Sequence, residues 1–306
     1  MPKPPNLEQT ILEPSPILDL AIVVAAVESQ RSIERCLDAI DRDRAGRVIE
    51  VVVVTPGSDA VAERAVARRS NTRLVVTKKD SLTPRLWSEG IAQTSSRAVA
   101  LLTGHCFVVP GWSSSLIAAL SDSAAAGGPL RLAKDASTLD AAIFFLRYSA
   151  YLDETSSRPV RDIAGDNAAY LRERIPSSSW NRGDGFWEHE VNRALAQRGD
   201  QIMWAHTAVV EFGSSFSLVS ICRHRYEHGR LFAISRVARG ENRARIACGF
   251  AIVPFVLVVR AWRRVSQVPR YAGAFMRSLP LMLVISFCWA LGETAGALEA
   301  ANAHRG

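Results

Sequence analysis

The sequence predicts an α/β protein in which a mostly parallel sheet is flanked by helices and followed by C-terminal helices associated with a membrane. Two observations predict the sheet: the early apolar runs are rich in Val and Ile throughout, and they alternate with helical patterns. Strands that are apolar on both faces are typical of parallel sheets covered by helices. A third observation sets the tail apart, because residues 214–306 carry a net charge of +9 and residues 1–213 carry −2.

The first part of the chain alternates between the two patterns. The expected strands are Leu20–Val27, Val48–Val54, Arg73–Thr77 and Ala98–Leu102. The expected helices are Ser29–Ile40, Asp59–Arg68, Leu82–Gln93, the stretch around Trp112–Leu120 and, further on, Glu188–Arg198. Residues 1–16 are rich in proline and lack the apolar core of a secretory signal, so we expect a loose lead-in. After Asp135 the periodicity weakens, and polar loops containing glycine follow.

Ligands of open parallel sheets bind beyond the carboxyl ends of the strands. We therefore expect the chemistry in the loops after Val27, Val54 and Leu102. No G-x-G-x-x-G follows the first strand and no G-x-x-x-x-G-K-[ST] occurs, which argues against a dinucleotide-binding dehydrogenase and a P-loop enzyme. The five cysteines are widely spaced, with no C-x-x-C pair, and this indicates neither a disulfide framework nor a zinc site. A reducing compartment fits this cysteine pattern best.

The tail combines its basic charge with the two most apolar runs of the chain, Ile246–Val259 and Leu279–Leu291. Arginine clusters bracket both runs, a pattern typical of attachment to an anionic membrane surface. Nucleic-acid binding is the rival explanation of a basic protein, but it has no use for such apolar runs. We therefore expect membrane lipids as partners and not nucleic acid.

Each apolar run has about fourteen residues between charges, fewer than the roughly 20 that cross a bilayer. A hairpin that crossed the membrane would also place arginines on both sides, against the positive-inside preference. We therefore expect helices that lie in, or dip into, the cytoplasmic leaflet, with the α/β domain in the cytoplasm. Spanning helices are the alternative, and an ordinary helical bundle or a dimer interface is a third possibility.

Four local patterns, in order along the chain, resemble the family 2 glycosyltransferases, whose fold is called GT-A. Residues 101–112, LLTGHCFVVPGW, look like the family's strand-end segment, in which an acidic D-x-D precedes a Pro and a Trp. Residues 164–170 are similar to the family's G-x-N-x-A segment, and residues 185–199 resemble the acceptor-side helix that ends at a Gly. Residues 223–230, RHRYEHGR, look like the basic-aromatic segment between catalytic domain and membrane.

The resemblance covers roughly residues 17–213 and implies a GT-A-like catalytic domain there, with membrane-associated helices over residues 214–306. It implies a nucleotide-sugar donor as substrate, a lipid-linked or glycan acceptor near the membrane, and inversion at the transferred sugar. Polysaccharide or glycolipid synthesis for the cell envelope is the expected setting. The sequence gives no indication of the sugar, the base or the oligomeric state.

The sequence departs from the family pattern at two donor-binding positions. In place of the D-x-D it has Thr103-Gly104-His105, without a carboxylate, and Thr55-Pro56 stands where the family has an Asp that recognises the base. Mg²⁺ and Mn²⁺ favour oxygen ligands, so His105 is a poor metal ligand by itself and metal use stays open. An inactive GT-A-like protein that binds a ligand or acts as a scaffold at the membrane is the alternative, and a nucleotidyltransferase is a third hypothesis.

By the resemblance, Glu188 is the general base, counted back from Gly199 at the end of its helix. The departing diphosphate needs positive charge, and Arg225 and Arg230 are candidates because guanidinium matches phosphate bidentately. Contact with lipid phosphates is the alternative for these two arginines. The residues expected to bind substrate are Glu28, Thr55, Gly104, His105, Asp166, Asn167, Trp187, Arg225 and Arg230. Each has a plainer alternative, such as a polar turn for Asp166 and Asn167 or core packing for Trp187.

Overall fold

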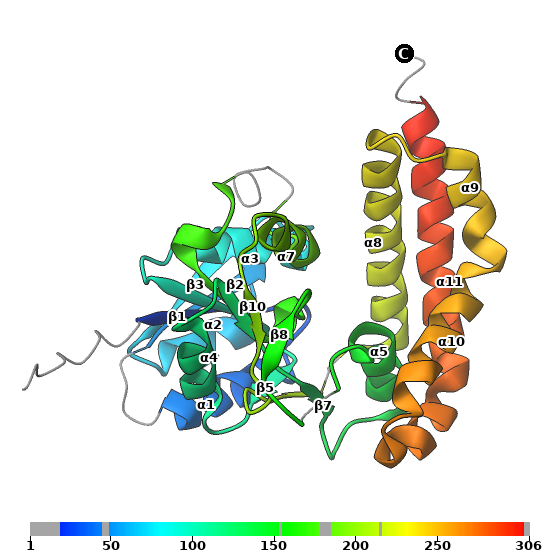
Figure 1. The fold of residues 1–306 in the computed structure, drawn as a ribbon. Helices are drawn as coiled ribbons and strands as arrows, with labels where there is room; N and C mark the ends of the chain where they lie inside the picture. Colours follow the sequence, from blue (N-terminus) through cyan, green and yellow to red (C-terminus); the bar gives the residue numbers. More distant parts are fainter. Residues whose placement is uncertain (1–18, 45–48, 153–154, 178–184, 214–215, 303–306) are drawn as a thin grey trace, which may run out of the picture.

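The computed structural model describes residues 19–44, 49–152, 155–177, 185–213 and 216–302. The lead-in expected at residues 1–16 lies outside them. The described chain forms an α/β domain, beside which the C-terminal helices stand as a separate layer (Figure 1).

The α/β domain is built on an eight-stranded sheet of order β3-β2-β1-β4-β9-β6-β10-β8. Six strands run in the same direction: β1 (Leu20–Ala25), β2 (Glu50–Pro56), β3 (Thr72–Thr77), β4 (Ala98–Thr103), β6 (Ala125–Gly127) and β10 (Ile202–Trp204). The other two strands are β8 (Arg158–Val160) and β9 (Ala168–Leu171). Strand β9 runs antiparallel to both β4 and β6, and β8 runs antiparallel to β10. The predicted sheet, mostly parallel and flanked by helices, is confirmed.

Alternate residues of the parallel strands supply two separate cores, as the two-residue period of a strand requires. Val51 and Val53 of β2 pack in one core with helices α1 (Ile33–Arg44), α2 (Ala60–Ala67) and α4 (Trp112–Leu120). Val52 and Val54 pack in the other with α3 (Thr83–Ala92) and α7 (Glu188–Gln197). Because both faces are covered, the strands are apolar throughout.

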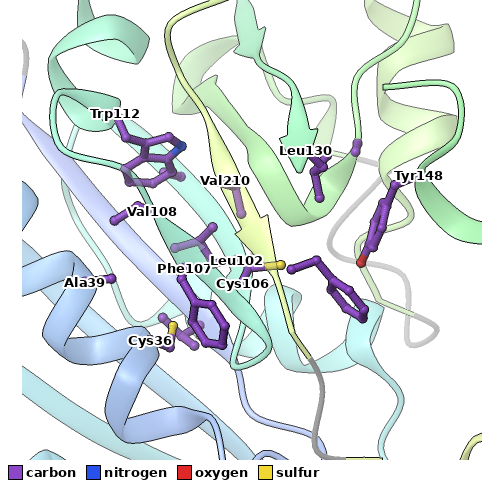
Figure 2. Close-up of a cluster of buried hydrophobic side chains, with 14 of the residues drawn as sticks. Cys36, Ala39, Leu102, Cys106, Phe107, Val108, Trp112, Leu130, Tyr148 and Val210 are labelled. Atoms are coloured by element: carbon purple, nitrogen blue, oxygen red, sulfur yellow. The ribbon is translucent and has the colours of Figure 1, made fainter. Parts of the chain in front are cut away.

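A small second sheet and a buried helix complete the domain. The sheet has the order β5-β11-β7, with β5 Cys106–Val108, β7 Leu130–Leu132 and β11 Val210–Phe212. Its side chains meet Trp112 and Tyr148 in one apolar cluster, shown in Figure 2. Tyr148 ends helix α5 (Thr138–Tyr148), which starts at a capping box of Ser137 and Asp140. The sequence analysis did not predict α5, because its consecutive buried residues 140–145 hide the helical period.

Over the described residues 216–302, the tail forms four α-helices, α8 (Leu218–Ala238), α9 (Arg243–Cys248), α10 (Val253–Val265) and α11 (Ala272–Asn302). Helices α8 and α11 lie side by side along their length (Figure 1). Gly292 and Gly296 of α11 face the backbone of α8, where an added Cβ would lie 2.0 Å from the Tyr226 oxygen and 2.1 Å from the Arg230 oxygen. Small residues allow such close helix packing. The carboxylate of Glu293, within α11, pairs with Arg236 of α8 at 2.9 Å.

One described helical stretch, Pro269–Ala300, has the length and composition of a membrane span, with a third (33%) of its apolar window buried in the protein. Helical segments Arg243–Ala251 and Val253–Val265 would give a second span only if counted together, and they are bent by 70°. Exposed apolar side chains also line the tail, among them Phe255, Val259 and Trp262. These features give weak support to the membrane association expected from the sequence.

Aromatic side chains join the tail to the α/β domain. Phe145 of α5 lies 5.8 Å from Tyr271 and 5.3 Å from Phe275 of α11, measured between ring centroids. Met282 and Ile285 belong to the same buried core as Phe144 and Phe145. A shared core therefore crosses the domain boundary expected at residue 213.

We predict that Gly292→Ala lowers the melting temperature, because its Cβ would overlap a backbone oxygen that cannot move without separating α8 from α11. Overpacking of this kind costs about 1–3 kcal/mol. Gly273→Ala, on the same helix, is the matched control, because its Cβ would meet only an Arg277 side-chain atom at 3.6 Å. Thermal unfolding in mild detergent checks both variants; equal melting temperatures for the two would contradict the packing described.

Candidate functional site

A cavity of about 620 Å³ opens at the carboxyl edge of the parallel strands, where the sequence analysis placed the chemistry. The strand-end residues Val27, Thr103 and His105 line one side of it. The other side is formed by residues from α5, from the loop before β9, and from α7 and α8. The site is therefore built by both the α/β domain and the tail.

Glu188 lies in the first turn of α7 and lines this cavity. Burial, followed by the neighbouring Asp166 carboxylate, raises the pKa of Glu188 to about 7. Gly165 allows the loop before β9 to approach, since an added Cβ would lie 3.1 Å from Cγ of Glu188 and 2.7 Å from the Trp87 ring. A carboxyl group with a pKa near neutrality can accept a proton from a hydroxyl and release it again.

Asp166 is 6% exposed at its side chain and pairs with Arg147 of α5, with 2.9 Å between Oδ2 and Nη2. Its other oxygen, Oδ1, is buried and has no hydrogen-bond partner among the described residues. Burial opposes the charge of Arg147, but the acidic groups around it, the Asp166 carboxylate first, together outweigh burial, so the pKa of Arg147 is raised overall. The sequence analysis missed Arg147. A single cation within the apolar run Ile143–Tyr148 is the signal that could have found it, because arginine is rarely buried without a partner.

Arg225 and His228 of α8 reach the same cavity. The Arg225 guanidinium lies over the Trp289 ring, 4.3 Å from its centroid, and among the described residues no carboxylate pairs with it. Burial and then the charge of Arg147 lower the pKa of Arg225 to about 10, which leaves it charged at neutral pH. Burial and the two arginines lower the pKa of His228 to about 3, so this imidazole is neutral.

His105 is buried at the cavity wall with both ring nitrogens engaged. Nε2 lies 2.8 Å from the Val27 carbonyl and Nδ1 lies 3.1 Å from the Ser32 hydroxyl. Because a carbonyl only accepts, Nε2 carries the proton and Nδ1 accepts from Ser32. Burial lowers the pKa of His105 to about 4. Gly104 beside it packs closely on Ser29, whose Cβ would lie 2.7 Å from an added Cβ.

Neither the strand-end segment nor its surroundings fit a divalent metal ion. Thr103-Gly104-His105 offers no carboxylate, and His105 has no free nitrogen. Across the described parts of the chain, no group of three or more His, Cys, Asp or Glu residues could hold a metal.

Three other candidates have different surroundings. Trp187 lines the cavity and also a larger one of about 1130 Å³ between α3, α7 and α8. Glu28 follows β1 with a left-handed φ of +47° and contacts α8, through Arg223 at 2.9 Å and His224 at 3.0 Å. Thr55 is fully buried and has an unpartnered hydroxyl. Glu28 and Thr55 are not part of the described cavity wall.

Asn167 and Arg230 do not reach the cavity either. The amide oxygen of Asn167 accepts a hydrogen bond from Trp112 Nε1 at 2.8 Å. Its amide nitrogen donates to the carbonyl oxygens of Pro129 and Ala208, at 3.1 and 2.8 Å. The Asn167 amide is therefore engaged in hydrogen bonds within the core. Arg230 pairs with Glu227 and Glu299 at 3.0 and 2.8 Å. Arg230 lies five positions after Arg225, which places it roughly 140° around the helix from Arg225.

No family model matches the sequence, and no curated protein matches it. Among solved structures, the chain is similar to the mannosyltransferase PcManGT from Pyrobaculum calidifontis in complex with GDP-Man and Mn²⁺, with a TM-score of 0.48 and 16% identity over 93% of this chain and 75% of that one. It is also similar to GalNAc-T7 with UDP, GalNAc and Mn²⁺, with a TM-score of 0.47 and 13% identity over 70% of this chain. The match spans about half (48%) of the GalNAc-T7 chain.

We predict that Glu188 makes the stability of the protein pH-dependent. The pKa of a glutamate in an unfolded chain is 4.5, and that of Glu188 in the folded protein is about 7, so the unfolded chain releases this proton first as the pH rises. The contribution of Glu188 to the free energy of unfolding is therefore present below pH 4.5 and is lost as the pH rises through about 7. The free energy of unfolding of the wild type, relative to that of Glu188→Gln, should therefore fall progressively as the pH rises from 4.5 through about 7. Urea unfolding of both proteins from pH 4.5 to 8 measures it; a difference independent of pH would contradict the raised pKa.

Proposed function

We propose that this chain is a glycosyltransferase of the family 2 type with a degenerate D-x-D, which uses a nucleotide-sugar donor. The observation that carries the proposal is one cavity that combines a carboxyl group of pKa about 7, Glu188, with the cations Arg147 and Arg225. Sugar transfer needs both: a base for the acceptor hydroxyl and positive charge for the departing diphosphate. The position of the cavity at the carboxyl edge of the strands supports the same conclusion.

The proposed reaction is a single displacement. The acceptor hydroxyl oxygen attacks the anomeric carbon of the donor sugar while Glu188 takes the hydroxyl proton. The bond between that carbon and the diphosphate oxygen breaks, and its electron pair stays on the diphosphate, so the configuration inverts. Burial, and after it the neighbouring Asp166 carboxylate, raise the pKa of Glu188 and thereby make it a stronger base. Because Glu188 must start ionised, the rate should rise with pH through about 7.

We predict that Glu188→Gln lowers the transfer rate by about 10²–10⁴-fold while donor binding changes little, since the amide keeps the shape but cannot take a proton. Glu190→Gln is the matched control, because Glu190 pairs with Arg239 at 3.3 Å and lies outside the wall of the 620 Å³ cavity. Radiolabelled sugar transfer to membrane lipid extracts measures the rate. A Glu188→Gln variant that keeps most of its activity would place the base elsewhere.

A second candidate function is a membrane-bound scaffold or ligand-binding protein without transfer activity. The absence of carboxylates from Thr103-Gly104-His105 favours it. A scaffold without a donor site binds no nucleoside diphosphate, whereas an inactive ligand-binding protein binds one but transfers no sugar. Calorimetric titration with UDP and GDP identifies the scaffold, and the transfer assay identifies the inactive ligand-binding protein.

The proposed location is the cytoplasmic face of a membrane, with residues 17–213 as the catalytic domain, residues 214–306 as the attachment, and a lipid-linked or membrane-proximal acceptor. Support comes from the side chains of α10, where Phe255, Val259 and Trp262 are 53%, 50% and 41% exposed. Arg260, Arg263 and Arg264 share this helix. Apolar and basic side chains on one helix suit insertion at an anionic lipid surface.

We predict that Val259→Glu weakens binding to vesicles containing anionic lipid by about tenfold or more, because burying a valine side chain contributes about 1.5–3 kcal/mol. Val76→Glu is the matched control: Val76 is 51% exposed, against 50% for Val259, but belongs to the sheet. Vesicle flotation of the full chain measures both. Equal losses in the two variants, or full-length protein that never floats, would contradict attachment through α10.

A further inference from the structure

The family that the sequence resembles uses a divalent metal to neutralise the departing diphosphate, and the residues of this chain do not fit one. The strand-end segment lacks the carboxylates that a hard cation needs, and both nitrogens of His105 are engaged. The diphosphate nevertheless needs positive charge as its bond to the sugar breaks. A different group at this edge of the sheet must supply that charge if the proposed function holds.

We propose that Arg147 contacts the departing diphosphate and takes the place of the metal. This assignment rests on the proposed function. Arg147 lines the same cavity as Thr103, His105 and Glu188, and its side chain is 26% exposed, so it is sheltered from bulk water but reachable from the cavity. Arg147 pairs with the buried carboxylate of Asp166, and this ion pair favours the charged form of the arginine.

The hydrogen bonds of Arg147 leave donors for a ligand. A guanidinium has five N–H donors. Within the described structure, one of its nitrogens, Nη2, bonds to Asp166, and the Tyr148 ring lies beside the group at 5.0 Å from its centroid. The remaining donors suit the paired oxygens of a phosphate. Water screens the charge of Arg147 less than that of a surface arginine, because the cavity is partly enclosed.

The surroundings of Arg147 favour an anionic ligand. Four arginines but two carboxylates line the described cavity wall. Asp166 already neutralises Arg147 in part, whereas Arg225 has no acidic partner among the described residues. His105 and His228 remain neutral at pH 7 and can donate or accept hydrogen bonds without adding charge. A diphosphate between Arg147 and Arg225 would balance the excess positive charge.

The Tyr148 hydroxyl lies beside Arg147 and is buried in the cavity wall. Burial raises its pKa well above the usual value, and the Asp166 carboxylate and a hydrogen bond to Asp166 act in the same direction. Tyr148 therefore stays protonated and adds no negative charge that would compete with an anionic ligand for Arg147.

Calorimetric titration of the full chain in detergent tests the proposal, with inorganic pyrophosphate, UDP and GDP as probes, each in EDTA and again in Mn²⁺. We expect the wild type to bind at least one probe in EDTA, with less than about a twofold gain from Mn²⁺. Arg147→Gln should weaken that binding by at least about tenfold, which is about 1.4 kcal/mol. Arg147→Lys keeps the positive charge but loses the bidentate geometry of the guanidinium, so it should weaken the binding less than Arg147→Gln does.

Arg230→Gln is the matched control and should bind like the wild type, because Arg230 faces Glu227 and Glu299 instead of the cavity. Arg147→Gln leaves Asp166 buried without a partner and could unfold the protein for that reason alone. The double variant Arg147→Gln/Asp166→Asn removes both charges of the pair. We expect it to restore the melting temperature but not the binding of the probe.

Two results would overturn the proposal, and they are distinguishable. In the first result, Mn²⁺ raises the affinity of the wild type for a probe tenfold or more, and the folded double variant binds that probe as tightly as the wild type. Arg147 then does not replace a metal, but the proposed glycosyltransferase function stands. If the wild type binds none of the three probes with or without Mn²⁺, the proposed function fails, and the role of Arg147 fails with it.

Discussion

The ion pair between Arg147 and Asp166 fixes the geometry on which the cavity depends. Arg147 comes from a helix that packs on the tail, Asp166 from the loop that enters β9, and Glu188 lies beside that loop at the start of α7. Burying both charges is costly, and losing one partner of such a pair typically destabilises a protein by about 3–5 kcal/mol. The pair therefore holds α5 and the β9 loop to each other, and the carboxylate that it fixes raises the pKa of Glu188.

Burial leaves the histidines of the site neutral, whereas its arginines stay charged. The histidines lose their charge when desolvated, so His105 and His228 are neutral hydrogen-bonding groups. The arginines stay charged because their pKa starts much higher: Arg147 has Asp166, and Arg225 has the face of Trp289. Among the described residues, the site is therefore positively charged and has no set of metal ligands. Such a site suits an anionic ligand.

The tail takes part in the site as well as in the expected attachment to a membrane. Helix α8 supplies Arg225 and His228, and its first turns are tied to the sheet edge through Glu28. Helix α11 holds α8 through Gly292 and Gly296 and supplies Trp289 under Arg225. The tail therefore supplies two side chains of the cavity wall, and the core shared by α5 and α11 holds it against the α/β domain.

The sequence alone determined the alternating strands and helices of the sheet, because strands buried on both faces must be apolar throughout, as at Val51–Val54. It also placed Glu188 at the start of a helix and the chemistry at the carboxyl edge of the strands. It did not show α5 or Arg147, since a helix buried nearly all round has no amphipathic period. Nor could it separate Asp166 from Asn167, or Arg225 from Arg230, because only packing decides which neighbour faces the cavity. The Asn167 side chain hydrogen-bonds to Trp112 and Ala208 in the core, and Arg230 pairs with Glu299. These partners come from distant parts of the chain.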